Sequence, residues 1–63
     1  MSMAWLVVDK NGTECVFTVK PTRSPYGTWR VYCFGNYIEL PEGSIKKLIG
    51  RELNWNDEPV ELK

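Results

Sequence analysis

The length of the chain is the strongest constraint on its fold. Sixty-three residues leave room for one domain, and a chain this short buries only roughly 60% of the surface that its unfolded form exposes. Such a chain needs a cross-link, a metal, a partner or a well-packed core. Its three Trp, three Tyr and two Phe can supply that core, because each buried ring removes about 150–250 Å² from water. We therefore expect residues 1–63 to form a single small domain.

The first third of the chain predicts a β-hairpin. Residues 3–8 are apolar, with aromatic and β-branched side chains, as is typical of a strand. Asp9 and Gly12 fit the first and fourth positions of a type I turn, with Gly12 left-handed. This turn places Val7 opposite Cys15. A competing two-residue turn would place two acidic residues opposite each other, which is unfavourable.

The next segments predict a second strand, a loop and a third strand. Residues 13–20 alternate between apolar and polar side chains, as a half-buried strand does. Residues 21–27 contain two prolines and a glycine, which predicts a loop without ladder pairing. Residues 29–34 alternate again. The expected core face of the second strand holds Cys15, Phe17 and Val19.

A second hairpin is predicted around Gly35 and Asn36, which fit a two-residue type II′ turn with glycine first. The fourth strand then begins at Tyr37 and ends at Pro41. One face of this hairpin is expected to be core and holds Val31, Cys33, Ile38 and Leu40. If the second and third strands also pair, Cys15 lies near Cys33.

A short helix and an interrupted strand are expected in the last third. Ser44 is the expected N-cap, and Gly50 the left-handed stop. The stripe facing the sheet is expected to hold Ile45, Leu48 and Ile49. The tail, residues 53–55 and 60–62, predicts a last strand that is interrupted at residues 56–59.

The resulting order is four strands, a short helix and a fifth strand, which is mainly β. In topology alone this order resembles the small SH3-like barrels, so we expect a five-stranded antiparallel SH3-like barrel or a curled meander. An OB-fold would place its helix after the third strand. The resemblance covers no sequence signature of the peptide-binding SH3 domains and carries no functional residue across.

The inventory of catalytic side chains is poor. The chain has no histidine, so the usual general base is missing. Cys15 and Cys33 fall on predicted core faces, whereas a reactive thiol needs exposure and a basic neighbour. Two cysteines without histidine also fall short of a structural zinc site. We expect no enzyme activity, no cofactor and no metal.

Charge and hydropathy indicate the compartment and the kind of partner. Eight basic and eight acidic side chains cancel, so the strong positive field of many nucleic-acid binders is absent. Residues 15–38 are mildly basic, and residues 52–62 are acidic. No signal-peptide pattern and no apolar stretch of membrane-spanning length occur. We expect a cytoplasmic protein with reduced thiols and no membrane contact.

The second face of the third and fourth strands is the candidate binding surface. Aromatic rings beside guanidinium groups suit a protein-binding hot spot, and they also suit stacking on single-stranded nucleic acid. Alternatively, the helix or the last strand covers this face as a second core. The candidate residues are Arg30, Tyr32, Phe34 and Tyr37, with Arg23 and Tyr26 from the neighbouring loop.

Trp55 among the acidic residues of the tail offers a second surface, for a basic partner, unless it is part of the core. Taken together, the sequence predicts a non-catalytic binding module, an accessory or regulatory protein that docks on a larger protein. The alternative is a weak single-stranded nucleic-acid binder, for which net charge zero provides few phosphate contacts. A homodimer through the aromatic face also fits the pattern.

Overall fold

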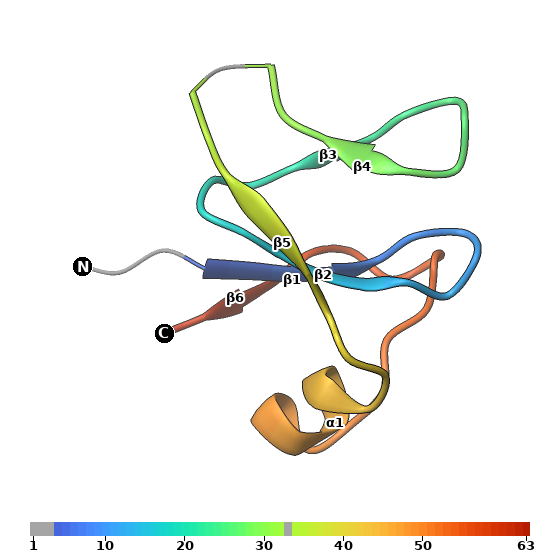
Figure 1. The fold of residues 1–63 in the computed structure, drawn as a ribbon, viewed down its shortest axis with the longest axis vertical. Helices are drawn as coiled ribbons and strands as arrows, with labels where there is room; N and C mark the ends of the chain where they lie inside the picture. The colour runs from blue at the N-terminus through green and yellow to red at the C-terminus, as the bar shows by residue number, and fades with distance from the viewer. Residues whose placement is uncertain (1–3, 33) are drawn as a thin grey trace.

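The fold of the protein was analysed in a computed structural model that describes residues 4–32 and 34–63 (Figure 1). All strand pairings among these residues are antiparallel. The prediction of a mainly β fold with one short helix before the last strand is therefore confirmed. The elements are β1 (Ala4–Val8), β2 (Glu14–Phe17), β3 (Thr22–Arg23), β4 (Trp29–Arg30), β5 (Tyr37–Leu40), α1 (Ser44–Ile49) and β6 (Val60–Leu62).

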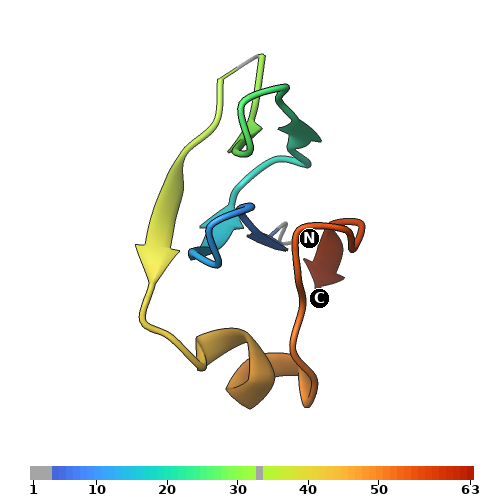
Figure 2. The ribbon, with the colours of Figure 1, turned by 90° about the vertical axis from the view of Figure 1, so that its right-hand side faces the viewer.

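The strands form two separate sheets. One has four strands in the order β5-β2-β1-β6, and the other consists of β3 and β4. Figure 2 shows the β3–β4 pair and α1 on opposite sides of the larger sheet. The described residues do not close a barrel, because β4 and β5 belong to different sheets and do not pair.

The first hairpin has the predicted turn and register. Gly12 N donates to the Asp9 carbonyl at 2.9 Å, and Gly12 has the left-handed φ of 94° that the type I turn with a glycine end requires. Val7 lies opposite Cys15 as expected. The second strand is shorter than residues 13–20, since pairing ends at Phe17.

The prediction of an unpaired loop at residues 21–27 is wrong at its start. Thr22 pairs with Arg30, and Arg23 pairs with Trp29, which makes β3 and β4. Both prolines lie outside this two-residue ladder and so remove no hydrogen bond from it. The turn that follows is organised by Ser24, whose side-chain oxygen accepts from the backbone N–H groups of Tyr26 at 3.1 Å and Thr28 at 3.3 Å.

The predicted hairpin around residues 35–36 is wrong. Gly35 does not have the positive φ that a type II′ turn needs at its first position. A side chain there would instead collide with Val19, because an added Cβ would lie 2.7 Å from its Cγ2. The chain instead crosses to β2. There the Thr18 N donates to the Asn36 carbonyl, and the Asn36 N donates to the Thr18 hydroxyl oxygen, both at 2.9 Å. Consequently β5 pairs with β2 and not with the third predicted strand.

The expected core face of that hairpin is split. Ile38 lies opposite Val16 and is 61% exposed. Leu40 packs on the α1 side of the sheet and Val31 on the β3–β4 side. The predicted contact between Cys15 and Cys33 lies outside the described residues, and Glu39 is the β5 residue paired with Cys15.

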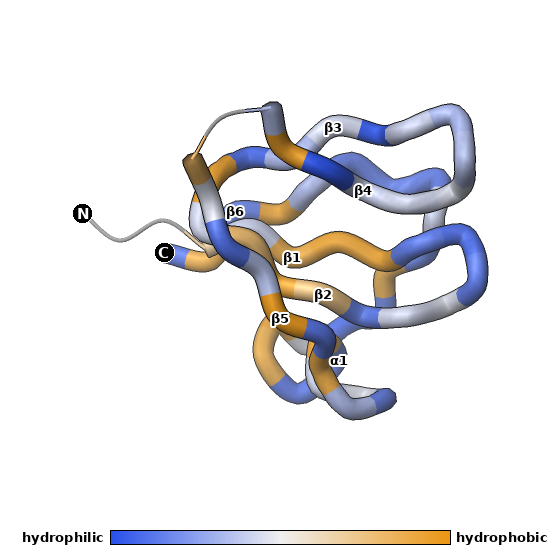
Figure 3. The backbone as a smooth tube through the Cα atoms, turned by 45° about the horizontal axis from the view of Figure 1, so that its top comes forward, coloured by the Kyte–Doolittle hydropathy of each residue, from blue (hydrophilic) through white to orange (hydrophobic). Residues whose placement is uncertain are grey.

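The core consists of two clusters, one on each face of the four-stranded sheet. Alternation along β1 and β2 sends successive side chains to opposite faces, and both strands are hydrophobic over most of their length (Figure 3). The cluster on the α1 side contains Leu6, Val8, Ile45 and Leu53. The cluster on the β3–β4 side contains Val7, Cys15, Phe17 and Trp29.

Helix α1 ends where expected, but it begins one residue early, at Ser44, and its cap differs from the prediction. Gly43, with φ 91°, is the N-cap, while the Ser44 hydroxyl donates to the Pro41 carbonyl at 2.6 Å. The Glu14 carboxylate from β2 accepts the free N–H groups of Gly43 at 2.7 Å and Ile45 at 2.8 Å. This carboxylate takes the role that the sequence suggested for Ser44.

The other end of α1 is as predicted, since Gly50 is left-handed with φ 80°. The expected apolar stripe is only partly correct, because Leu48 is 51% exposed whereas Ile45 is buried. Residues 53–55 form no strand, and the last strand is limited to β6, which pairs with β1.

Candidate functional site

The four aromatic residues of the candidate surface are all exposed. The exposed fraction is 81% for Tyr26, 75% for Tyr32, 100% for Phe34 and 58% for Tyr37. Arg30 is exposed as well. Neither α1 nor β6 therefore buries this surface as a second core.

A groove of about 710 Å³ lies between β4 and β5, and we call it the seam groove. Phe17 and Trp29, which are 2% and 6% exposed, line it, as does the buried Cys15. Tyr32 follows β4 and Tyr37 begins β5, so the groove brings two of the predicted site residues together across the boundary of the two sheets. The defining residues are Phe17, Trp29, Tyr32 and Tyr37, with the carboxylates Asp9 and Glu39.

Of the remaining predicted residues, only Arg30 also lines the seam groove. Phe34 follows β4 outside the groove lining, and Tyr26 lies in the β3–β4 turn. The Phe34 side chain is fully exposed and forms no part of the groove walls.

Hydrogen bonds fix the groove at the β4 end. The Trp29 indole Nε1 donates to the Val8 carbonyl at 2.8 Å, and the Trp29 backbone N donates to Asp9 Oδ1 at 3.1 Å. Lys10 N donates to the Gly27 carbonyl at 2.9 Å, which ties the β1–β2 turn to the β3–β4 turn. These bonds hold the small sheet against the large one.

A ring stack fixes the groove on the β5 side. The Phe17 and Tyr37 rings lie 4.9 Å apart between centroids at an angle of 17°. The two residues are paired across β2 and β5, so they share one face of the sheet. The Tyr37 ring therefore forms one wall of the groove and is held there by its cross-strand pair, although its outer side is exposed to water.

The acidic groups of the groove lie close enough to affect each other. Burial raises the pKa of the Asp9 carboxyl, the Trp29 N–H lowers it in part, and the charge of Glu39 raises it further. Burial and the charges of Asp9 and Glu39 raise the pKa of the Cys15 thiol to about 11. This thiol is therefore protonated at neutral pH and is a poor nucleophile.

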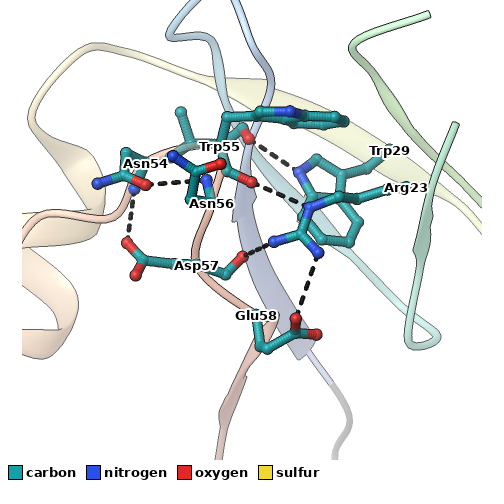
Figure 4. Close-up of polar contacts among 8 residues, drawn as sticks. Arg23, Trp29, Asn54, Trp55, Asn56, Asp57 and Glu58 are labelled. Atoms are coloured by element: carbon teal, nitrogen blue, oxygen red, sulfur yellow. Dashed lines mark hydrogen bonds and ion pairs between the residues drawn. The ribbon is translucent and has the colours of Figure 1, made fainter. Parts of the chain in front are cut away.

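The side chain of Arg23, another predicted binding residue, makes contacts with other residues of this chain (Figure 4). Its Nε donates to the Trp55 carbonyl at 3.0 Å, its Nη2 to the Asp57 carbonyl at 3.0 Å and its Nη1 to Glu58 at 3.2 Å. The guanidinium also lies over Trp29 at 4.7 Å from the ring centroid. Arg23 thus joins the basic stretch to the acidic tail.

The loop that receives Arg23 is shaped by its own polar side chains. Asn54 N donates to the Asp57 carboxylate at 2.8 Å, and Asn56 N donates to the Asn54 side chain at 2.9 Å. These contacts turn the Trp55 and Asp57 carbonyls toward Arg23. Trp55 itself is half-buried, with its ring edge-on to Trp29 at 5.5 Å. It belongs with the core and not with an exposed acidic surface.

Sequence reasoning missed Asp9, Phe17, Trp29 and Glu39 as groove residues. Phe17 and Trp29 were assigned to a core face, and they are buried. Asp9 and Glu39 come together only through the β1–β2 and β2–β5 registers, in which Cys15 lies opposite both Val7 and Glu39. No local pattern in the sequence reports the second of these registers.

The chain was also compared with known proteins. No protein-family model, no curated protein and no solved structure matches it. Within residues 4–32 and 34–63, no group of three or more His, Cys, Asp or Glu side chains is placed to hold a metal ion. In the same part of the chain, no helix has the length and apolar content needed to cross a membrane.

Proposed function

We propose that this protein is a non-catalytic binding module, an accessory or regulatory protein that docks on a larger protein through the seam groove and the aromatic side chains around it. One observation carries the proposal. Tyr32 and Tyr37, 75% and 58% exposed, line one groove together with the buried rings of Phe17 and Trp29. Aromatic anchors around a concave site are the usual centre of a protein–protein interface.

The charges of the groove favour protein over nucleic acid. Arg30 is its one basic lining residue among those described, and Asp9 and Glu39 line the same groove. Two carboxylates repel the phosphates whose neutralisation supplies most of the affinity for single strands. Single-stranded nucleic acid is therefore the less favoured ligand.

The finer parts of the proposal concern the fold and the compartment. The order of the strands resembles that of the small SH3-like barrels, and we propose this likeness for the topology alone, because the open seam between β4 and β5 is the docking site. A cytoplasmic location is supported by the free, buried thiol of Cys15, since reducing compartments keep thiols in this state.

The proposal is tested by truncating the most exposed aromatic side chains. Tyr32→Ala with Phe34→Ala should abolish capture of the protein partner from a lysate of the producing cells, measured by quantitative mass spectrometry. Because these rings are 75% and 100% exposed, the same change should lower the free energy of unfolding by no more than about 1 kcal/mol. Leu48→Ser is the matched control, since it removes an exposed apolar side chain on α1 outside the groove.

Each alternative has its own signature in this experiment. Unchanged capture by the double variant would contradict the proposed surface. A loss of several kcal/mol would show that the rings serve as core instead. Recovery of nucleic acid, with an affinity that falls steeply as salt rises, would replace the protein partner by a single strand.

A further inference from the structure

We infer that the seam groove takes an extended basic segment of the partner protein, which adds as a strand beside β5 and places a lysine or arginine side chain against Glu39 and Asp9. This inference rests on the proposed function and specifies the chemistry of the partner. Three features of the described residues support it: the open edge of β5, the alternation of its side chains and the charge of the groove.

The first feature is the edge of β5. It is the last strand of the four-stranded sheet, with β2 on one side and no described strand on the other. Its residues, Tyr37–Leu40, include no proline, and their one charge is that of Glu39, which opposes pairing with an acidic strand but favours a basic one. An extended peptide that adds to a free edge gains main-chain hydrogen bonds along its length.

The second feature is the alternation along β5. Tyr37 and Glu39 line the seam groove, whereas Ile38 points to the opposite face and is 61% exposed. A partner residue directly opposite Glu39 would therefore point its side chain into the groove, and so would the residue opposite Tyr37. The residue between them would lie against Ile38.

The third feature is charge. Glu39 is paired with Cys15 across β2 and β5, and Asp9 lines the same groove as these two residues. The only ion pair among the described residues joins Arg23 and Glu58, so neither groove carboxylate is neutralised by one. A basic side chain opposite Glu39 is a favourable cross-strand pair, and aromatic walls add cation–π attraction.

These features define the pattern of the bound segment. A basic residue lies opposite Glu39, and an apolar residue two positions away lies opposite Tyr37, against the outer side of its ring. The intervening residue is apolar because it covers Ile38. The three residues opposite Tyr37, Ile38 and Glu39 are therefore apolar, apolar and basic in that order. The segment needs an extended backbone to present them to the sheet edge.

Two other occupants of the β5 edge compete with the basic segment. A second copy could pair through an antiparallel β5–β5 contact with Ile38 opposite Ile38, but this register places Glu39 opposite Tyr37 and leaves it without a base. The chain could also close its own seam, with the segment after Arg30 pairing along β5. Both arrangements occupy the edge without a partner protein.

The test is a titration of the full chain, labelled with ¹⁵N, by three end-blocked hexapeptides. The first contains valine and threonine with one central lysine, and the other two carry glutamine or glutamate in place of the lysine. The lysine peptide should shift the backbone amides of residues 37–40 and of Trp29. We expect it to bind about three- to five-fold more tightly than the glutamine peptide, as expected for one favourable cross-strand charge pair.

Variants assign the preference to the groove. Glu39→Gln should remove the difference between the lysine and glutamine peptides. Glu61→Gln is the matched control, because this acid lies on β6 at the other edge of the same sheet, and it should leave the difference unchanged.

Several results would overturn the inference. Equal binding of all three peptides would refute the basic partner, and the absence of shifts at residues 37–40 would refute strand addition. Concentration-dependent shifts of these amides without peptide would assign the edge to a second copy, and cross-strand contacts from residues 30–32 to β5 in the free protein would assign it to the chain itself. The proposed function is judged separately, by partner capture with the Tyr32/Phe34 variant.

Discussion

Asp9 serves the fold with both its backbone and its side chain. Its carbonyl accepts from Gly12 N in the first turn, and its Oδ1 accepts from Trp29 N at 3.1 Å. Both roles need an oxygen at this position, but neither needs a charge. Burial, together with Glu39, raises the pKa of this carboxyl, so the charged form opposes folding at neutral pH.

Asp9→Asn should therefore stabilise the protein at pH 7. Asparagine keeps the Oδ1 acceptor and suits the first position of the turn, while it removes a partly buried charge. Because the pKa of Asp9 is raised on folding, the folded state holds more protons than the unfolded state between the ordinary pKa of 3.8 and the raised value. The destabilising effect of the charged carboxyl therefore disappears as the pH falls through this window, and the free energy of unfolding rises.

The difference in free energy of unfolding between the variant and the original protein should thus be largest near pH 7 and disappear below the ordinary aspartate range. Urea titrations at a series of pH values measure it. A difference that grows toward low pH would contradict the assignment. If the seam groove binds a basic segment, the same variant should bind it less well, which is the usual exchange of stability against function at a binding site.

The short helix shows how one element depends on another. α1 has six residues, and a helix of one or two turns does not persist in water without tertiary support. Glu14 provides part of that support, because each of its carboxylate oxygens accepts an N–H at the start of the helix, from Gly43 and from Ile45. The acceptor comes from a strand about thirty residues earlier, so the cap also fixes α1 on β2.

Glu14→Ala should lower the free energy of unfolding by about 0.5–2 kcal/mol, the usual range for a lost N-cap. Glu14→Gln keeps one amide oxygen as acceptor and should cost less. Chemical denaturation followed by circular dichroism measures both changes. Glu42→Ala is the matched control, since this exposed acid precedes the helix and makes no side-chain hydrogen bond among the described residues. Equal effects at the two positions would refute a specific cap.

The two hairpin predictions show which elements a sequence can specify. The first was correct because turn chemistry and strand alternation agree over adjacent residues, with Gly12 at the required positive φ. The second failed although Gly35-Asn36 fits a local turn. Gly35 is needed for close packing against Val19 instead, and β5 pairs with β2, twenty or more residues away in the chain. Local signals do not report a competing long-range partner.

The candidate site follows the same division. From the sequence, Tyr32 and Tyr37 were grouped on one face of a hairpin that does not form, yet both residues line the seam groove. The groove beneath them was not foreseen. It exists because β4 and β5 do not form the expected hairpin, so the space between two sheets lies open over Phe17.

At the scale of the whole molecule, the charge asymmetry in the sequence has a structural role that composition alone did not reveal. The sequence shows a mildly basic stretch, residues 15–38, and an acidic tail, residues 52–62. Arg23 joins the two stretches by hydrogen bonds to residues 55–58, and its guanidinium faces the Trp29 and Trp55 rings, at 4.7 and 5.5 Å from their centroids. This clasp closes the small sheet onto the tail that leads into β6, and it completes the cluster around Trp29.

Arg23→Lys should therefore lower the free energy of unfolding although the charge is kept. A lysine ammonium lacks the planar fork that reaches two carbonyls and stacks on an indole ring, so we expect a loss of about 1–3 kcal/mol, in line with hydrogen bonds to charged groups. Most of this loss should come from the carbonyl bonds and the ring contacts and not from the ion pair, because Glu58 is 80% exposed. Glu58→Gln should accordingly change stability by less than about 0.5 kcal/mol.

Arg30→Lys, an exposed change on the adjoining strand, is the matched control and should be close to neutral. Thermal and urea unfolding followed by tryptophan fluorescence measure all three variants. An Arg23→Lys protein as stable as the original would show that the β3–β4 sheet and the acidic tail hold together without these contacts.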